Sequence, residues 1–143
     1  MPEGLSKVEP QEFSVSPLAG TLGAEVRGLD VRGLNGLPDD LNDVFLRHKV
    51  LAIRGQYLDP ATFLAFSKLW GDIHFYPYMT GLPEEPEVFE IRTAPDATRV
   101  FGNRWHSDQM YDAYPCKATL LYAKDLPPVG GDTIFTEIGR AHV

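Results

Sequence analysis

The segment Trp105–Thr136 constrains the fold of this chain more than any other. It opens with the tripeptide His106-Ser107-Asp108 and closes with Gly-Gly-Asp-Thr at residues 130–133. On an extended strand, residues i and i+2 project to the same face, roughly 6.5–7 Å apart. The imidazole and the carboxylate can then supply two of the three ligands of a two-histidine-one-carboxylate iron site. An isolated His-x-Asp is more often a surface strand with two solvated side chains, so the neighbouring residues decide.

Those neighbours follow a defined order. Pro115 precedes an apolar run, Ala118–Ala123, and Lys124-Asp125-Leu126-Pro127 leads into Gly-Gly-Asp-Thr-Ile-Phe. Together with Trp-His-Ser-Asp, these motifs resemble the taurine dioxygenase-like family of Fe(II)- and 2-oxoglutarate-dependent dioxygenases, and the resemblance extends back to about Pro17. It implies an α+β, mainly β fold, a double-stranded β-helix (jelly roll) with flanking helices. Only the N-terminal half of that fold would be present here.

The resemblance also implies roles for three side chains. His106 and Asp108 would bind Fe(II), and the Thr133 hydroxyl would help to hold the carboxylate of 2-oxoglutarate. In the family a second histidine ligand, and an arginine that pairs with this carboxylate, come from much farther along the chain and have no counterpart here. The implied reaction uses O2 to hydroxylate a small organic acid, while 2-oxoglutarate is decarboxylated to succinate. We expect this chain to be inactive alone.

The expected substrate pocket departs from that of the taurine enzyme. As we align them, that enzyme has a histidine at Tyr76, a tyrosine at Met79 and an Asp-Asn pair at Phe101-Gly102. These differences argue against taurine and favour an organic acid with a bulkier apolar body. The expected pocket residues are Tyr76, Met79, Phe101 and Met110.

A rival interpretation is a self-contained metal protein. In it, His74 joins His106 and Asp108 around zinc or iron, and the protein is a small hydrolase or a binding module. Its weakness is that nothing in the sequence positions a general base or an anion hole. His48, by contrast, reads as a histidine at the edge of the core.

Composition limits the kinds of partner the chain can bind. With a net charge of −7 and a pI near 5.0, the chain lacks the excess of basic residues that nucleic-acid binding needs, so we expect a small-molecule substrate and no nucleic acid. No apolar run reaches transmembrane length and the N-terminus lacks a signal-peptide pattern, which predicts a cytoplasmic protein without membrane contact. The single cysteine, Cys116, suggests a buried, inert thiol at the head of a strand. Homo-oligomerisation of a full-length parent stays open.

The chain divides into three parts. We expect residues 1–12 to form a loose tail and residues 13–137 to form the N-terminal part of a dioxygenase jelly-roll domain. The last residues, Ile138–Val143, have no counterpart that we recognise in the family and read like translated sequencing adapter, so we expect a non-native tail.

Alternation and capping signals predict the elements. We expect strands at 13–15, 24–28 and 88–91 from alternation, a buried strand at 50–53 from a short apolar run, and further strands around His106 and over Ala118–Ala123. One helix should start at Pro38 and bury a face formed by Leu41, Val44, Phe45 and His48. A second should be capped by Asp59, begin at Pro60, pack an aromatic stripe against the sheet (Phe63, Phe66, Trp70) and stop at Gly71.

Overall fold

The computed structural model describes residues 12–74, 76–98 and 101–140. Its contacts divide the chain into two compact units. The first holds the residues up to Tyr57 and those from Ala123 onward, and the second holds Leu58–Tyr122. Most of the expected N-terminal tail, residues 1–11, and the last three residues lie outside the described part. In the described residues, no helix is long and apolar enough to cross a membrane.

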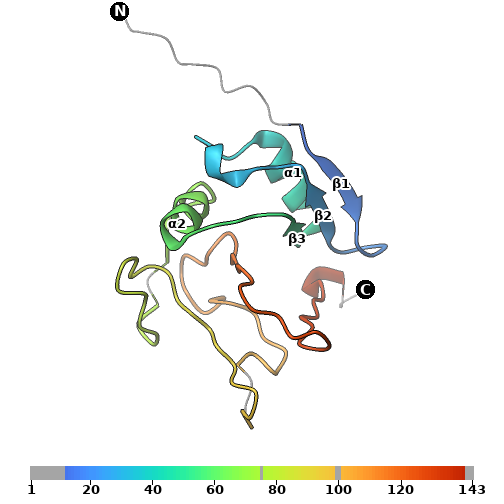
Figure 1. Ribbon diagram of the computed structural model, residues 1–143. Coiled ribbons are helices and arrows are strands. Elements are labelled where there is room, and N and C mark those ends of the chain that lie inside the picture. The colour runs from blue at the N-terminus through green and yellow to red at the C-terminus, as the bar shows by residue number, and fades with distance from the viewer. Residues whose placement is uncertain (1–11, 75, 99–100, 141–143) are drawn as a thin grey trace, which may run out of the picture. The chain divides into compact units, whose positions relative to one another are not determined.

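A three-stranded mixed sheet organises the first unit (Figure 1). The strands β1 (Ser14–Pro17) and β2 (Ala24–Arg27) pair antiparallel, and β2 pairs parallel with β3 (Leu51–Ile53). Gly23, at φ 87°, closes the β1–β2 turn by accepting a hydrogen bond from the Leu18 N–H. All three strands confirm predicted strands to within one or two residues.

The connection from β2 to β3 contains the first helix, because parallel neighbours need a long crossover. Helix α1 spans Asp39–His48, and Pro38 stands at its N-cap, just outside the helix. Leu41 is buried and the rest of the predicted inner face is half-buried, whereas Asp43 and Arg47 are exposed. The predicted helix face is therefore confirmed. The prediction that the 50–53 strand is buried is wrong, since all of β3 is only half-buried.

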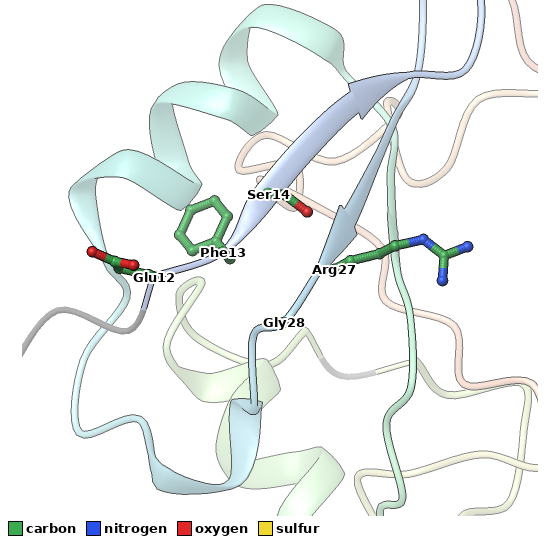
Figure 2. A pocket seen from close by; sticks show the side chains of 5 residues that line it. All are labelled: Glu12, Phe13, Ser14, Arg27 and Gly28. Carbon is green, nitrogen blue, oxygen red and sulfur yellow. The ribbon is translucent and has the colours of Figure 1, made fainter.

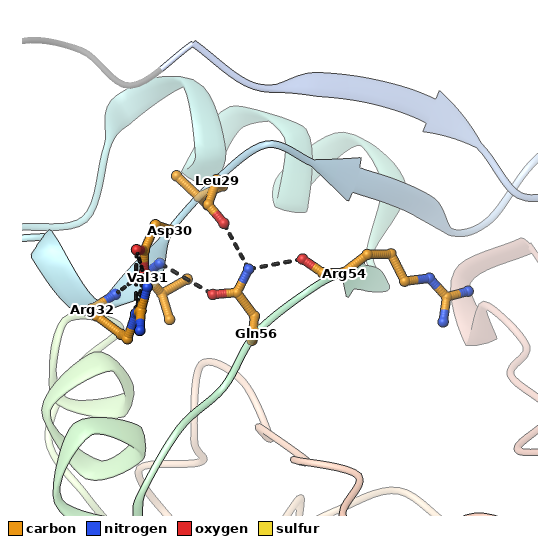
Figure 3. A network of polar contacts seen from close by, with 6 residues as sticks. All are labelled: Leu29, Asp30, Val31, Arg32, Arg54 and Gln56. Atoms are coloured by element: carbon orange, nitrogen blue, oxygen red, sulfur yellow. Dashed lines mark hydrogen bonds and ion pairs between the residues drawn. The ribbon is translucent and has the colours of Figure 1, made fainter.

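A single side-chain amide connects the end of the sheet to the crossover (Figure 3). Gln56 donates to the carbonyls of Leu29 (2.6 Å) and Arg54 (2.8 Å) and accepts from the Val31 N–H (3.2 Å). Val31 opens a short 3-10 helix, Val31–Gly33. The apolar core of this unit lies alongside and consists of Ala24, Val26, Leu29, Val31 and Leu41.

The second unit is built around α2 (Pro60–Lys68). As predicted, Asp59 caps this helix, accepting from the Thr62 N–H at 2.7 Å, and Pro60 is its first residue. The helix ends three residues before Gly71. Phe66 and Trp70 are buried and meet edge to face, with ring centroids 6.1 Å apart. Packing of this aromatic stripe against the sheet stays a prediction.

Beyond α2, the described residues up to Glu137 form no helix or strand. The predictions of strands at 88–91, at Ala118–Ala123 and around His106 are therefore wrong for this structure. The backbone groups of Val88 form hydrogen bonds within a local turn instead of a sheet. The Val88 N–H donates to the Glu85 carbonyl, and the Val88 carbonyl accepts from the Leu82 N–H. Residues 118–123 do alternate between half-buried and exposed, as a strand does, but lack a hydrogen-bonded neighbouring strand in the described residues.

Residues 117–122 instead pack on α2 and the residues at its ends. The Lys117 ammonium lies 5.6 Å from the centre of the Trp70 ring, and the Tyr122 ring lies 6.1 Å from that of Phe63. The Tyr122 hydroxyl also accepts from the Leu58 N–H at 3.2 Å. Contacts at both ends therefore fix the position of the run between them.

Candidate metal centre and substrate cavity

His106 and Asp108 converge although they lie in a loop. His106 Nε2 is 3.3 Å from Asp108 Oδ1, and both side chains are about half exposed, at 54% and 48%. Gln109, which follows, has a positive φ of 51°. This left-handed backbone is uncommon for a residue with a side chain and turns the chain directly after the pair.

Each side chain of the pair has a partner on its far atom. His106 Nδ1 lies 2.7 Å from the Arg104 carbonyl oxygen. A carbonyl can only accept, so Nδ1 carries the proton, and in the neutral ring Nε2 keeps its lone pair. Asp108 Oδ2 accepts from the Thr119 hydroxyl at 2.8 Å. Nε2 and Oδ1 are left facing one another.

This arrangement fits a metal ion. Two ligand atoms bound at about 2.1 Å and at a right angle lie roughly 3.0 Å apart. The 3.3 Å between Nε2 and Oδ1 is close to that separation. One imidazole and one carboxylate are also the donor types expected for two positions of a non-haem iron site.

The rival three-residue site is not assembled. In the described part of the chain, no three His, Cys, Asp or Glu side chains come together as a metal site, so His74 does not join His106 and Asp108. His74 Nε2 instead faces Asp112 Oδ2 at 3.8 Å.

Two of the four expected pocket residues line one cavity of about 210 Å³. Tyr76 and Met79 face it, and the Phe89 ring meets that of Tyr76 edge to face at 6.3 Å. Phe101 and Met110 do not line it and are 63% and 65% exposed. The other lining residues are Ile73, His74, Pro86 and Glu87.

A tight turn forms one wall of this cavity. The Leu82 N–H donates to the Val88 carbonyl at 2.8 Å, which folds Pro86 back over Gly81. A Cβ on Gly81 would lie 1.9 Å from the Pro86 carbonyl oxygen. Only glycine fits there, and so the shape of the wall depends on it.

The cavity borders the segment that follows His106 and Asp108. His74 lines the cavity and contacts Asp112, four residues after Asp108.

Cys116 is half-buried and contacts Gln109. Burial, followed by the negative charges of Asp112 and Asp108, raises the pKa of the Cys116 thiol. This keeps the thiol protonated and unreactive at neutral pH.

Residues 14–142 match the family described as "Taurine catabolism dioxygenase TauD, TfdA family". The chain belongs to this family. Membership implies a 2-oxoglutarate co-substrate and a jelly-roll fold, with which the small mixed sheet and two helices of the described residues are compatible. The match includes residues 138–142, so the predicted non-native tail stays a prediction.

Curated relatives within the TauD/TfdA family share the cofactor dependence in their names. The chain is 31% identical over 135 residues to an alpha-ketoglutarate-dependent sulfate ester dioxygenase from Pseudomonas putida, with 92% of this chain and 44% of that protein covered. It is 27% identical to an (S)-phenoxypropionate/alpha-ketoglutarate-dioxygenase from Sphingobium herbicidovorans, covering 91% and 47%. It is 28% identical to an alpha-ketoglutarate-dependent 2,4-dichlorophenoxyacetate dioxygenase from Burkholderia sp., covering 72% and 40%. The chain thus spans about half the length of the relatives it matches.

Thr133 belongs to the first unit and is exposed. Gly130 and Gly131 precede it with φ of 79° and 76°. Two successive positive φ values make a turn that favours glycine. The chain therefore turns just before Thr133, and no strands flank this turn in the described residues.

Three features of the site are not predicted by the sequence. The Thr119 hydroxyl, the Arg104 carbonyl and the Phe89 ring all act through contacts that no local pattern encodes. The sequence offers one indication of the Thr119 contact: apart from Tyr122, Thr119 is the only residue of the run Ala118–Ala123 whose side chain can form a hydrogen bond.

A larger but shallow cleft, of about 490 Å³, lies where β1 begins and β2 ends (Figure 2). Its lining includes Glu12, Phe13 and Arg27. Arg27 extends away from the Phe13 ring and pairs with Glu25. The charged groups therefore do not converge on a ligand position.

Proposed function

We propose that this chain is part of an Fe(II)- and 2-oxoglutarate-dependent dioxygenase that hydroxylates a small organic acid. The observation that supports the proposal most is the approach of His106 Nε2 to Asp108 Oδ1 at 3.3 Å in a chain of the TauD/TfdA family. Residues 13–137 would form the N-terminal part of its double-stranded β-helix.

The side chains divide the work. His106 offers a neutral nitrogen lone pair and Asp108 a negative oxygen, which together bind and partly neutralise Fe(II). Thr133 donates its hydroxyl to a carboxylate of 2-oxoglutarate, as a short donor suited to one oxygen. Iron, when bound, supplies the redox chemistry that couples decarboxylation of 2-oxoglutarate to succinate with hydroxylation of the substrate.

The cavity supports an apolar substrate body. Tyr76, Met79 and Phe89 offer two aromatic rings and a thioether, which exclude water and pack against hydrocarbon or an aromatic ring. Two of the relatives named above are dioxygenases of phenoxy acids and one of sulfate esters. An organic acid with an apolar or aromatic body is the substrate class we propose.

The test uses the full-length parent, meaning the longer protein that contains this sequence. Succinate formation from 2-oxoglutarate with Fe(II) and O2 is measured while phenoxy acids and alkyl sulfates are screened. His106→Ala and Asp108→Asn should each reduce turnover by at least about 100-fold, because each removes a metal ligand. His48→Ala, on α1, is the matched control and should retain activity. Undiminished turnover in His106→Ala would overturn the proposal.

The 143-residue chain alone should form no succinate. In its described residues, only two candidate ligands face a common point, and an ion held by two side chains exchanges readily. Turnover by this chain at the rate of the parent would show that its own residues suffice.

A further inference from the structure

Thr119 contacts the Asp108 carboxylate from eleven residues farther along the chain. Its hydroxyl donates to Asp108 Oδ2 at 2.8 Å, while Asp108 Oδ1 faces His106 Nε2 at 3.3 Å. The two carboxylate oxygens thus have different neighbours: Oδ2 accepts from the Thr119 hydroxyl, and Oδ1 faces the imidazole of His106.

We propose that Thr119 is a positioning residue that fixes Asp108 for one-oxygen binding of the metal. The inference rests on the proposed function. A free aspartate rotates broadly about χ2, so either oxygen, or both, can turn toward an ion. A hydrogen bond from the Thr119 hydroxyl to Oδ2 restricts this rotation and keeps Oδ1 directed at the metal position. Donation to an ionised carboxylate is also stronger than a hydrogen bond between neutral groups.

The local structure holds Thr119 rigidly enough for this role. Lys117 lies over the Trp70 ring and Tyr122 packs on Phe63, so the run is anchored on both sides of Thr119. Ala118 and Leu120 are half-buried while Thr119 is exposed, which directs its side chain away from the packed face. Thr is moreover β-branched, and its χ1 is restricted.

The imidazole has an equivalent partner. The Arg104 carbonyl accepts from His106 Nδ1 at 2.7 Å, on the ring atom remote from the metal position. Each ligand is therefore oriented by one hydrogen bond on its far atom, an arrangement typical of the outer shell of metal sites. The partner of His106 is a backbone carbonyl, which substitution does not remove. Of the two hydrogen bonds, the one from Thr119 can therefore be tested by mutation.

The experiment measures metal affinity as well as catalysis. Co(II) and, without oxygen, Fe(II) are titrated into the metal-free parent, followed by the Co(II) absorption spectrum and by calorimetry. Thr119→Val, which replaces the hydroxyl by a methyl group, should weaken Kd about 10–100-fold. Thr119→Ala should do the same without adding apolar surface. Thr119→Ser should stay within about threefold of the parent because it keeps the hydroxyl. Thr93→Val, at an exposed threonine, is the matched control.

The outcomes distinguish failure of the Thr119 role from failure of the proposed metal centre. Equal Kd values for Thr119→Val and the parent would overturn the positioning role, and so would equal weakening in Thr119→Val and Thr119→Ser. If His106→Ala and Asp108→Asn also bind metal like the parent, the proposed metal centre itself fails. Thermal unfolding of the metal-free variants should match the parent, because Thr119 is exposed.

Discussion

At the scale of single residues, the approach of His106 to Asp108 shows what a short motif can and cannot encode. The i, i+2 spacing of His106 and Asp108 predicted that both side chains could reach one ion, and they do converge. The strand that was meant to produce this geometry is absent. The Arg104 carbonyl, two residues before His106, and the Thr119 hydroxyl, eleven residues after Asp108, orient the side chains instead, and the i, i+2 spacing predicts neither contact.

His74 provides a direct test of the ligand set. Because it faces Asp112 and lines the cavity, His74→Ala should leave the iron content of the parent unchanged while altering the KM for the organic substrate. Metal analysis of the purified protein and steady-state kinetics give the two values. Loss of iron comparable to that of His106→Ala would restore the three-residue alternative.

Gly81 is a steric constraint on the cavity wall. Gly81→Ala places a Cβ 1.9 Å from the Pro86 carbonyl oxygen, so the turn must open, at a cost of about 1–3 kcal/mol. We expect a lower melting temperature and a raised KM. Gly36→Ala is the matched control, since a Cβ there meets nothing within 4 Å. Equal behaviour of the two variants would show that the turn is not closed in solution.

At the scale of elements, the helices were predictable because their signals are local. Capping at Asp59, proline at the first turn and the spacing of apolar residues all lie within a few positions of the helix they define. The strands β1 and β2 were predictable by alternation, and β3 by its short apolar run. Residues 118–123 are also a short apolar run, and their burial alternates, but they form no strand, since a strand also needs a partner that local sequence does not supply.

The cap of α2 should respond to both mutation and pH. Hydrogen bonds from Thr62, first from its side chain and then from its N–H, lower the pKa of the Asp59 carboxyl below 3.8. A depressed folded-state pKa stabilises above 3.8, and the gain is lost as pH falls through the lower folded value. Asp59→Ala should lower the melting temperature by roughly 3–6 °C at pH 7, and Asp59→Asn, which keeps an acceptor oxygen but loses the charge, should lower it by less.

Thermal unfolding from pH 7 down to pH 2 checks both parts. The difference between the parent and Asp59→Ala should shrink as the carboxyl is protonated. A difference that stays constant with pH would mean that the carboxylate charge has no part in the cap.

At the scale of the whole molecule, the backbone hydrogen bonds are unevenly distributed. The sheet holds its amides in ladders, as when the Ala24 N–H donates to Val50 and the Arg54 N–H to Val26. Residues 101–137 belong to no ladder in the described part of the chain. In hydrogen exchange followed by mass spectrometry, we expect slow exchange over 24–27 and 50–54 and fast exchange over 118–123 in this chain.

The same measurement on the parent tests the jelly-roll proposal. If its remaining residues supply the missing strand partners, exchange over 118–123 should slow by at least about tenfold. Equally fast exchange in both proteins would argue against a strand there in either. This would also leave the double-stranded β-helix without one of its predicted strands.

Gln56 has a consequence for how its position tolerates change. Its planar carboxamide presents a donor and an acceptor at one site, as a peptide unit does, and so prolongs the β2–β3 pairing past the last ladder bond. Glutamate offers acceptors alone, and leucine of similar size offers neither. A ranking of substitutions by volume or polarity would therefore misjudge residue 56, where a side chain imitates main chain and its reach and hydrogen-bonding groups decide what can replace it.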